Sequence, residues 1–302
     1  MDQVIFIEEI KIVDAFINKV KIDMQLLQSG FCISIKIPEC MVEIEENVFV
    51  FHERRIEVRF VKGSNLLNNM NAVITGASRG IGKATARIFA THGYDLFLTS
   101  KNEEILLQTI EELKKEFPNV SVDGKAFDLG KKQQVQLFGE WVNANADSVD
   151  VVVNNAGSFV QGNVSDEPDG ALEEMMEVNL YSAYHLTRTL LPKMKAAKLG
   201  HIFTLCSIAS LGAYPNGGAY SISKFALLGF TKNLRRELQP HGIKVTAIIP
   251  GAAYTDSWKS SGISEQRFME ADDIAKVIYD ATLLSPQAVV EEIIIRPQLG
   301  DL

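Results

Sequence analysis

The sequence has few of the features that mark a secreted, metal-binding or membrane-spanning protein. Only three of its 302 residues are cysteines, Cys32, Cys40 and Cys206, and none forms a C-x-x-C pair or a metal-type pairing with histidine. An odd, low cysteine count is typical of a reducing compartment. No run approaches the roughly 18 uninterrupted apolar residues that a spanning helix needs. The first ten residues carry acids where a signal peptide has basic residues. We therefore expect a cytoplasmic protein with no metal site.

Positive charge is also scarce, since 30 Lys and Arg face 38 Asp and Glu and the net charge is −8. With a pI of about 5.3, we expect neither nucleic acid nor an anionic membrane as a partner. The composition is otherwise that of a globular protein, with 46% hydrophobic and 23% charged residues. At this length the chain can form one large α/β domain, or one domain with an appendage.

The most informative stretch is the segment 71–83. A short apolar run at 72–74 predicts a buried strand, and an amphipathic run at 83–92 predicts a helix. Between them stand the three glycines Gly76, Gly80 and Gly82. A Cβ at such positions would clash in the turn or hold a pyrophosphate away from the backbone. A strand, a glycine turn and a helix direct free N–H groups and a positive helix end at a phosphate. The stretch indicates dinucleotide binding, although glycine turns of this kind also occur with no ligand.

From Met70 onward, strand-like and helix-like runs alternate. The predicted strands are 72–74, 94–99, 120–127, 149–153, 201–206, 243–249 and 292–295. The predicted helices are 83–92, 103–117, 132–145, 170–198, 219–238 and 271–283. Repeated βα units with right-handed crossovers predict an α/β fold with a doubly wound parallel sheet, which binds ligands at the carboxyl ends of its strands.

A phenol and an ammonium stand one helical turn apart at Tyr220 and Lys224, on one face of a predicted helix. A phenol is a weak acid–base group at neutral pH, and a nearby cation favours its ionised form and makes it more useful for proton transfer. Such pairs are also common on protein surfaces by chance. Ser207 lies at the carboxyl end of a predicted strand, where site residues of such sheets gather.

Asparagines complete the pattern. The turn Asn154-Asn155-Ala156-Gly157 ends the predicted strand 149–153, beside the point where the strand order should reverse. Asn179 lies inside a predicted helix, where its side chain is mildly unfavourable. Each feature has an ordinary explanation, as a turn, a cap or a solvent-facing residue. All of them together at these spacings favour a catalytic site.

In this combination the chain resembles the short-chain dehydrogenase/reductase family over residues 71–297. The spacing G-x-x-x-G-x-G after a leading threonine, from Thr75 to Gly82, is similar to the cofactor loop of that family. The N-N-A-G turn and an Asn–Ser–Tyr–Lys tetrad follow in the family's order. The resemblance implies a Rossmann fold and an oxidoreductase that moves a hydride between NADP(H) and a carbonyl/alcohol pair. The 3-oxoacyl-[acyl-carrier-protein] reductase-like branch is the most similar.

The resemblance assigns catalysis to four residues. Tyr220 would give a proton to a carbonyl or take one from an alcohol, and Lys224 would ease the ionisation of that phenol and bind the nicotinamide ribose. Ser207 would polarise the substrate oxygen, and Asn179 would hold a water in a proton relay. Besides Tyr220 and Lys224, the expected cofactor contacts are Gly76, Ser78, Arg79, Gly80, Ile81, Gly82, Lys101, Asp128, Leu129, Asn155, Ala156, Gly157, Pro250, Gly251 and Thr255.

The end of the second predicted strand indicates NADP(H) rather than NAD(H). NAD-specific relatives of this fold carry an acid there that binds the ribose 2′-OH and repels a 2′-phosphate. The segment 98–102 contains no acid, and the nearest ones, Asp95 and Glu103, fall at the wrong end of the strand and in the next helix. Arg79 and Lys101 would bring two cations to the phosphate, although single basic residues usually face solvent.

Residues 1–69 show no catalytic pattern. The segments 31–37 and 53–60 alternate apolar and polar residues, which predicts half-buried strands and a small β-rich accessory domain. The alternative is that the native chain starts at Met70, because members of the resembled family begin close to their first strand. We favour the second interpretation and expect 70–302 to be the NADP-binding catalytic domain.

The resemblance further implies a homodimer or homotetramer that pairs through the helices predicted at 170–198 and 219–238. Apolar residues that fit either a core or an interface are Leu186, Leu190, Phe225 and Leu228. The expected ligand is a small carbonyl or alcohol substrate whose identity the sequence leaves open. The alternative is a catalytically silent dinucleotide-binding sensor or scaffold. Such a relative would be expected to have lost Tyr220 or Lys224.

Overall fold

The computed structural model describes residues 70–255, 258 and 262–301, and the backbone of five short strands before residue 70. The chain divides into two compact units, Met1–Asn68 and Asn69–Leu302.

The described strands of the first unit form two small antiparallel sheets. One pairs β1 (Phe31–Cys32) with β5 (Val61–Lys62), and the other joins β2 (Val42–Glu45), β3 (Val48–Phe51) and β4 (Arg54–Glu57). Strand structure is therefore present at the start of the predicted segment 31–37 and inside 53–60. The rest of both segments lies outside the described residues.

The second unit is built on a seven-stranded sheet in which every paired strand is parallel. Its order is β12-β11-β10-β9-β6-β7-β8. The strands are β6 (Asn71–Thr75), β7 (Asp95–Thr99), β8 (Val122–Gly124), β9 (Val151–Asn154), β10 (His201–Leu205), β11 (Lys244–Pro250) and β12 (Glu292–Ile295). The chain winds outward from β6 in one direction and from β9 in the other, so the order reverses between these two strands. The predicted doubly wound sheet is confirmed.

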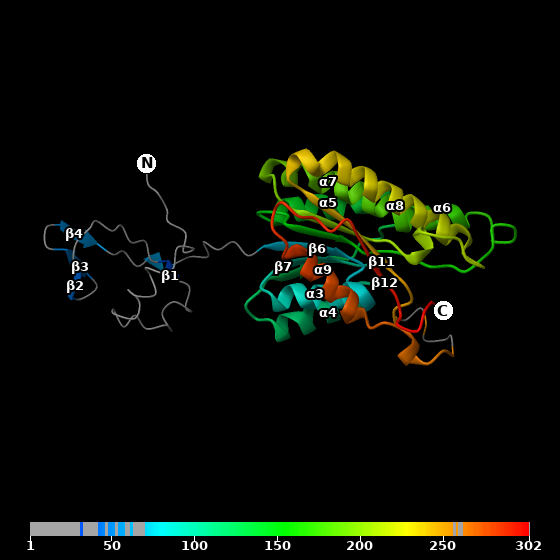
Figure 1. Cartoon of the computed structure of the whole chain (residues 1–302), viewed down its shortest axis with the longest axis horizontal. Helices are drawn as coiled ribbons and strands as arrows, with labels where there is room; N and C mark the ends of the chain where they lie inside the picture. The colour runs from blue at the N-terminus through cyan, green and yellow to red at the C-terminus, as the bar shows by residue number, and fades with distance from the viewer. Residues whose placement is uncertain are drawn as a thin grey trace. The chain divides into compact units, whose positions relative to one another are not determined.

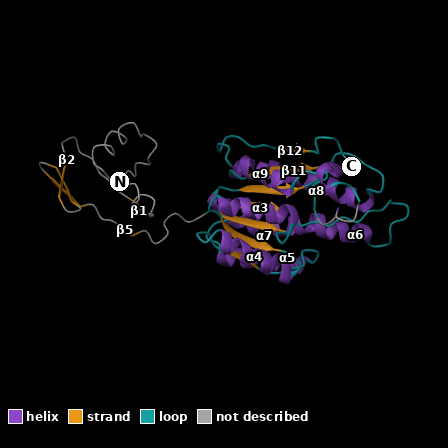
Figure 2. Cartoon of the chain, turned by 90° about the horizontal axis from the view of Figure 1, so that it is seen from below, coloured by secondary structure: helices purple, strands orange, loops and turns teal. Residues whose placement is uncertain are grey.

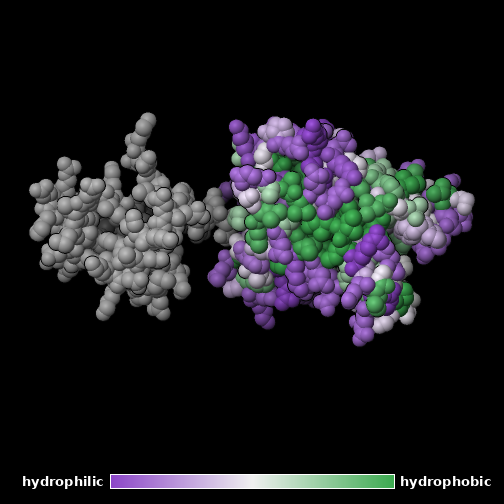
Figure 3. Space-filling model, in the orientation of Figure 1, coloured by the Kyte–Doolittle hydropathy of each residue, from purple (hydrophilic) through white to green (hydrophobic). Residues whose placement is uncertain are grey.

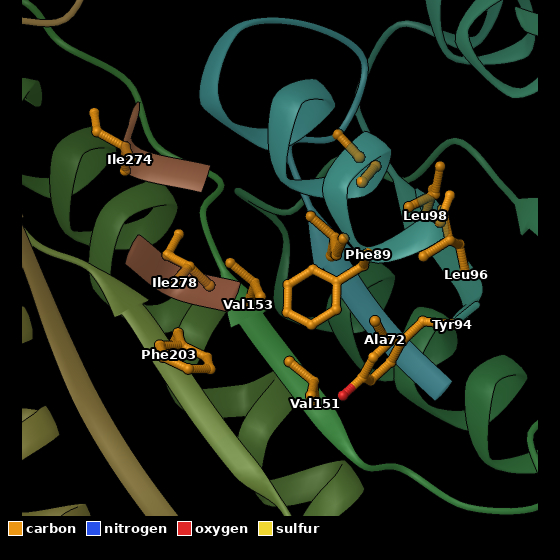
Figure 4. Packing of buried hydrophobic residues seen from close by; sticks show 14 of the residues in the cluster. Ala72, Phe89, Tyr94, Leu96, Leu98, Val151, Val153, Phe203, Ile274 and Ile278 are labelled. Carbon is orange, nitrogen blue, oxygen red and sulfur yellow. The ribbon is translucent and has the colours of Figure 1, made fainter. Parts of the chain in front are cut away.

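Helices cover both faces of this sheet (Figures 1 and 2). On one face lie α3 (Gly80–Thr91), α4 (Glu103–Glu116) and α9 (Ala271–Thr282), and on the other α5 (Lys132–Asn145), α7 (Ser182–Ala197) and α8 (Gly218–Leu238). Alternate residues of β6 serve the two cores, since Ala72 and Ile74 belong to one cluster and Val73 to the other. Figure 4 shows the first core, where Phe89 of α3 lies among residues of the sheet.

Most predicted ends shift by one to three residues, as in α3, which begins at Gly80 rather than 83, and two elements differ more. The strand predicted at 120–127 forms β8 only over Val122–Gly124, at the edge of the sheet beside β7. The helix predicted at 170–198 is three pieces: α6 (Ala171–Met176), a π-helical turn at Glu177–Tyr181, and α7. Pro192 lies inside α7 without ending it.

Within the part of the chain that the structure describes, no helix has the length and apolar character needed to cross a bilayer. The cytoplasmic location that the composition indicates stays a prediction.

Candidate active site

The glycine turn has a shape that only glycine allows. Gly76 and Gly80 have φ of +65° and +54°, the left-handed region that disfavours other residues. A Cβ on Gly82 would lie 2.2 Å from the carbonyl oxygen of Gly76 and 2.5 Å from Asn155 Nδ2. Helix α3 starts at Gly80 with no acidic residue in its first turn. The positive end of α3 therefore faces the glycine turn, and no carboxylate in the first turn of the helix neutralises it, as an anion site requires.

The glycine turn is bonded to the N-N-A-G turn across the sheet. The hydroxyl oxygen of Thr75 accepts the backbone N–H groups of Asn155 and Ala156, at 3.0 and 2.9 Å. In return, Asn155 Nδ2 donates to the carbonyl oxygens of Thr75 and Gly76, at 2.8 and 3.2 Å. Thr75 leads the motif but is absent from the predicted site residues. The signal available in the sequence was the position of Thr75 directly before Gly76, at the end of a predicted strand. Its hydrogen-bond partners lie some 80 residues further along the chain.

Ser207 follows β10, the strand that lies between β9 and β11 in the sheet. It caps a short 3-10 helix (Ile208–Ser210), and its hydroxyl oxygen accepts the N–H of Ala209 at 3.2 Å. The serine is buried, with 8% of its surface exposed. The hydroxyl of Ser207 is therefore fixed by its bond to the backbone of the short helix that it caps.

Tyr220 and Lys224 lie one turn apart on α8. Lys224 Nζ lies 5.8 Å from the centre of the Tyr220 ring and donates to the carbonyl oxygen of Leu205 at 2.7 Å. Lys224 is 5% exposed, so its ammonium is held between α8 and the end of β10. The structure thus brings Lys224 to the same strand end as Ser207.

Asn179 lies in the middle of the π-helical turn and is 1% exposed. Its Oδ1 accepts the N–H of Ser158 at 2.8 Å, and its Nδ2 donates to Ser158 O at 3.1 Å and Ser223 Oγ at 2.9 Å. A Cβ on Gly157 would lie 3.0 Å from Asn179 Oδ1 and 3.5 Å from Lys224 Nζ. Gly157 therefore lies between these two predicted catalytic residues. Single π turns inside helices are frequent at functional sites.

The predicted adenosine side is arranged around Asp128. Lys101 Nζ lies 3.1 Å from Asp128 Oδ2, with 78% of the lysine side chain exposed. Partial burial alone would raise the pKa of Asp128. The bonds from Lys101 and the Gly130 N–H, with the charge of Lys131, outweigh burial and lower it. Arg79 is exposed immediately before α3. Lys101 and Asp128, which the sequence suggested as two separate cofactor contacts, thus form an ion pair with each other.

The remaining predicted contacts fall around the glycine turn and the end of β11. Ser78 is buried and its carbonyl accepts the hydroxyl of Thr109 at 3.0 Å, and Ile81 packs on the first core. Leu129 is buried in the second core. Pro250 ends β11, and Gly251 donates its N–H to Ile295 at 2.8 Å. A Cβ on Gly80 would lie 3.2 Å from Thr255 Cγ2, so Thr255 adjoins the glycine turn.

Cys206 lies between β10 and Ser207 and is buried. Burial raises the pKa of its thiol, which keeps the thiol protonated at neutral pH. A redox role for this cysteine has no support in its surroundings.

A cavity of about 450 Å³ lies beside the start of α8. It is lined by Asn163, Val164, Ala213, Tyr214, Pro215, Asn216, Gly217, Gly218, Ser221, Ile222 and Phe225. Ser207, Tyr220 and Lys224 are not among the lining residues, although Gly218 and Ser221, on either side of Tyr220 in α8, are. Burial, aided by the charge of nearby Tyr220, raises the pKa of Tyr214 to about 12.

Comparisons with known proteins point to one family. A sequence model of the short chain dehydrogenase family matches residues 70–266. An uncharacterized oxidoreductase of Bacillus subtilis is 33% identical over 219 residues, which are 72% of this chain and 77% of that protein. A putative ketoacyl reductase of monensin polyketide synthesis from Streptomyces virginiae is 34% identical over 186 residues, 61% of this chain and 70% of that protein.

Solved structures are also similar. An alcohol dehydrogenase from the archaeon Thermococcus sibiricus, complexed with 5-hydroxy-NADP, has a TM-score of 0.71 and 30% identity. The match covers 77% of this chain and 98% of the archaeal one. L-sorbose reductase from Gluconobacter frateurii, complexed with NADPH and L-sorbose, has a TM-score of 0.71 and 26% identity, over 76% and 96% of the two chains.

Proposed function

Since the chain belongs to the short-chain dehydrogenase/reductase family, a family of oxidoreductases, we propose that it reduces a carbonyl or oxidises an alcohol with NADP(H) and with Tyr220 as general acid–base. One observation carries the proposal. Lys224 bonds the carbonyl of Leu205, two residues before Ser207, and lies over the ring of Tyr220, while Gly157 adjoins both Asn179 and Lys224. This cluster adjoins the point where the strand order reverses, which is where such sheets bind ligands.

The cofactor would be held by the glycine turn, the first turn of α3 and the N-N-A-G turn. Gly76 and Gly82 let the two turns pack closely, since a Cβ on either would lie within 3 Å of Asn155 Nδ2, and a turn without side chains lets a pyrophosphate approach the backbone. When bound, a nicotinamide supplies or accepts the hydride. The chain's own residues bind, orient and move the proton.

In the proposed reduction, the phenol of Tyr220 donates its proton to the substrate oxygen as that oxygen gains negative charge. The hydroxyl of Ser207 donates a hydrogen bond to the same oxygen. Lys224 holds a positive charge beside the phenol as the phenol gives up its proton. In oxidation the same groups act in reverse, with the phenolate taking the alcohol proton.

The part of Asn179 in this scheme is to shape the site. Its amide already makes three hydrogen bonds to Ser158 and Ser223, so the side chain has no donor left for a water. A relay water would then donate to an oxygen of Asn179, either Oδ1, which has a second lone pair, or the backbone carbonyl within the π-helical turn.

The choice of NADP(H) rests on three supports. The end of β7 has no acid, Lys101 and Arg79 lie on the predicted adenosine side, and several structural neighbours hold NADP or NADPH. Lys101 is paired with Asp128. A 2′-phosphate would therefore compete with that carboxylate for the ammonium, and the preference should depend on salt concentration.

The Tyr220→Phe variant tests the catalytic assignment. We expect kcat to fall by roughly 10²–10⁴, the usual contribution of a general acid–base group, with NADPH binding nearly unchanged. Tyr214→Phe is the matched control, because it removes a neighbouring phenol from a cavity wall. Near-unmodified turnover in Tyr220→Phe, or loss of turnover only in Tyr214→Phe, would show that the proton comes from elsewhere.

The alternative is a silent dinucleotide-binding sensor or scaffold. It is disfavoured because Tyr220 and Lys224 are both present, whereas a silent relative would be expected to have lost one of them. Steady-state oxidation of NADPH over a panel of carbonyls separates the two. The panel starts with 3-oxoacyl thioesters, since a relative is a putative ketoacyl reductase, and includes L-sorbose, which a structural neighbour binds.

We also propose that the protein is a homodimer or homotetramer. Of the four apolar residues that fitted a core or an interface, Leu186, Leu190 and Leu228 lie in the core of the chain, and Phe225 of α8 is 46% exposed. Figure 3 shows a further apolar area on the face turned to the viewer, in the region where Figure 1 draws β11 and β12. Ile294 of the edge strand β12 is 53% exposed. Exposed apolar surface at a sheet edge favours association.

A further inference from the structure

The first turn of α8 has no cap from its own sequence. The residue before the helix is Gly217, which has no side chain, and the first turn contains no acid. The first N–H groups of a helix need acceptors, and a carboxylate there also stabilises the positive helix end. Glu167 supplies one from 52 residues away, since its Oε2 accepts the N–H of Ala219 at 3.1 Å.

We propose that Glu167 is a positioning residue for Tyr220. Ala219 directly precedes Tyr220, so the bond restrains the backbone of the proposed acid–base residue itself. The inference rests on the function proposed above, because it gives Glu167 a role in turnover as well as in the fold. Glu167 belongs to the β9–α6 connection, residues 155–170, and acts through α8 without touching the reacting atoms.

The β9–α6 connection reaches the same helix end at further points. Gly162 donates its N–H to Asn216 O at 3.2 Å, and Asn216 donates its N–H to Asn163 Oδ1 at 3.2 Å. The ring of Phe159 meets the ring of Tyr220 edge to face, with centres 4.8 Å apart and planes at 83°. The connection therefore restrains Tyr220 twice, at its backbone through Glu167 and at its ring through Phe159.

Gly218 makes the close approach possible. Its φ is +30°, and a Cβ there would lie 2.5 Å from Glu167 Oε2 and 2.5 Å from Gly162 O. Any larger residue must push the carboxylate or the connection away from α8. Gly218, the first residue of α8, and Glu167 therefore depend on each other. The sequence around either residue does not show this contact.

The test compares Glu167→Ala and Glu167→Gln in the full-length protein. Asp166→Asn is the matched control, because the carboxylate of this neighbouring acid bonds Asn163 and Ser165 of its own segment. Three quantities are measured: kcat with a carbonyl substrate, the Kd of NADPH, and amide hydrogen exchange of peptides from α8.

We expect Glu167→Ala to speed exchange in the first turn of α8 by about fivefold, the usual effect of removing a helix cap. The last turns of α8 should be unchanged. The kcat value should fall by a similar factor or more, with the Kd of NADPH within about twofold. Glu167→Gln keeps an acceptor oxygen and should recover most of kcat, and Asp166→Asn should behave as the unmodified protein.

The outcomes separate this inference from the proposed function. If the unmodified protein reduced no carbonyl, the proposed function would fail and the inferred role in turnover with it, while local exchange in Glu167→Ala would still show whether the carboxylate holds the helix end. If the unmodified protein is active and Glu167→Ala keeps its kcat and its exchange rates, the inference is overturned. Equal losses in Ala and Gln together with faster exchange along all of α8 would also overturn it, because they indicate general destabilisation. Gly218→Ala gives a second test that leaves Glu167 in place, and its effect should not add to that of Glu167→Ala.

Discussion

Asn179 offers the sharpest test of how the site is built, because its side chain joins three segments that are distant in the sequence. In Asn179→Ala, the N–H and carbonyl of Ser158 and the hydroxyl of Ser223 each lose a partner. Each such hydrogen bond contributes about 1 kcal/mol net, and more where a buried group is left unpaired. Ser158 is only partly buried, so water can replace some of what is lost.

We therefore expect Asn179→Ala to lower the free energy of unfolding by about 2–4 kcal/mol. For a unit of this size each kcal/mol shifts Tm by roughly 2–4 °C, so the midpoint should fall by about 10 °C. Asn179→Asp should be at least as destabilising, because it keeps the acceptor for Ser158 N–H but turns a carboxylate oxygen toward Ser158 O.

The assay is thermal unfolding by circular dichroism, with denaturant titration for the free energy. Asn233→Ala is the matched control, since Asn233 is exposed and bonds only within its own helix, to Gly229 O. That change should stay within about 0.5 kcal/mol. A loss below about 1 kcal/mol in Asn179→Ala would refute the reasoning, since the amide would then not hold the N-N-A-G turn to α8.

Three further predictions concern the cofactor, the first 69 residues and assembly. The double variant Arg79→Ala, Lys101→Ala should raise KM for NADPH far more than for NADH, and equal kcat/KM for both cofactors in the unmodified enzyme would contradict the proposed preference. A 70–302 fragment should fold and keep full activity, because the described catalytic machinery lies within it; an inactive or insoluble fragment beside an active full-length protein would make residues 1–69 an integral part. Light scattering at micromolar concentration should give a dimer or tetramer mass, and a monomer mass would count against pairing through α7, α8 or β12.

Local patterns in the sequence were enough for most of the fold. Apolar periodicity predicted α5 and β12 with the bounds that the structure has, and placed α4, α8 and α9 to within one residue at each end. These elements are decided by neighbours within a few positions, by the helical and strand repeats and by residues such as Pro118 that stop a helix. Chirality and the βα alternation then leave few topologies, so the parallel sheet followed as well.

Tertiary contacts decided what those patterns could not. The predicted helix 170–198 contains a π-helical turn at Asn179, whose side chain bonds Ser158 and Ser223, 21 and 44 residues away. The ion pair of Lys101 with Asp128 and the bond of Glu167 to α8 are likewise contacts between segments that only the folded sheet brings together. Leu186 and Phe225 are both apolar residues of predicted helices, so the sequence does not distinguish them. In the folded chain Leu186 is buried and Phe225 is exposed. A side chain's own sequence neighbourhood carries no information about which distant segment will satisfy its hydrogen bonds, so the arrangement of the predicted site residues had to come from the structure.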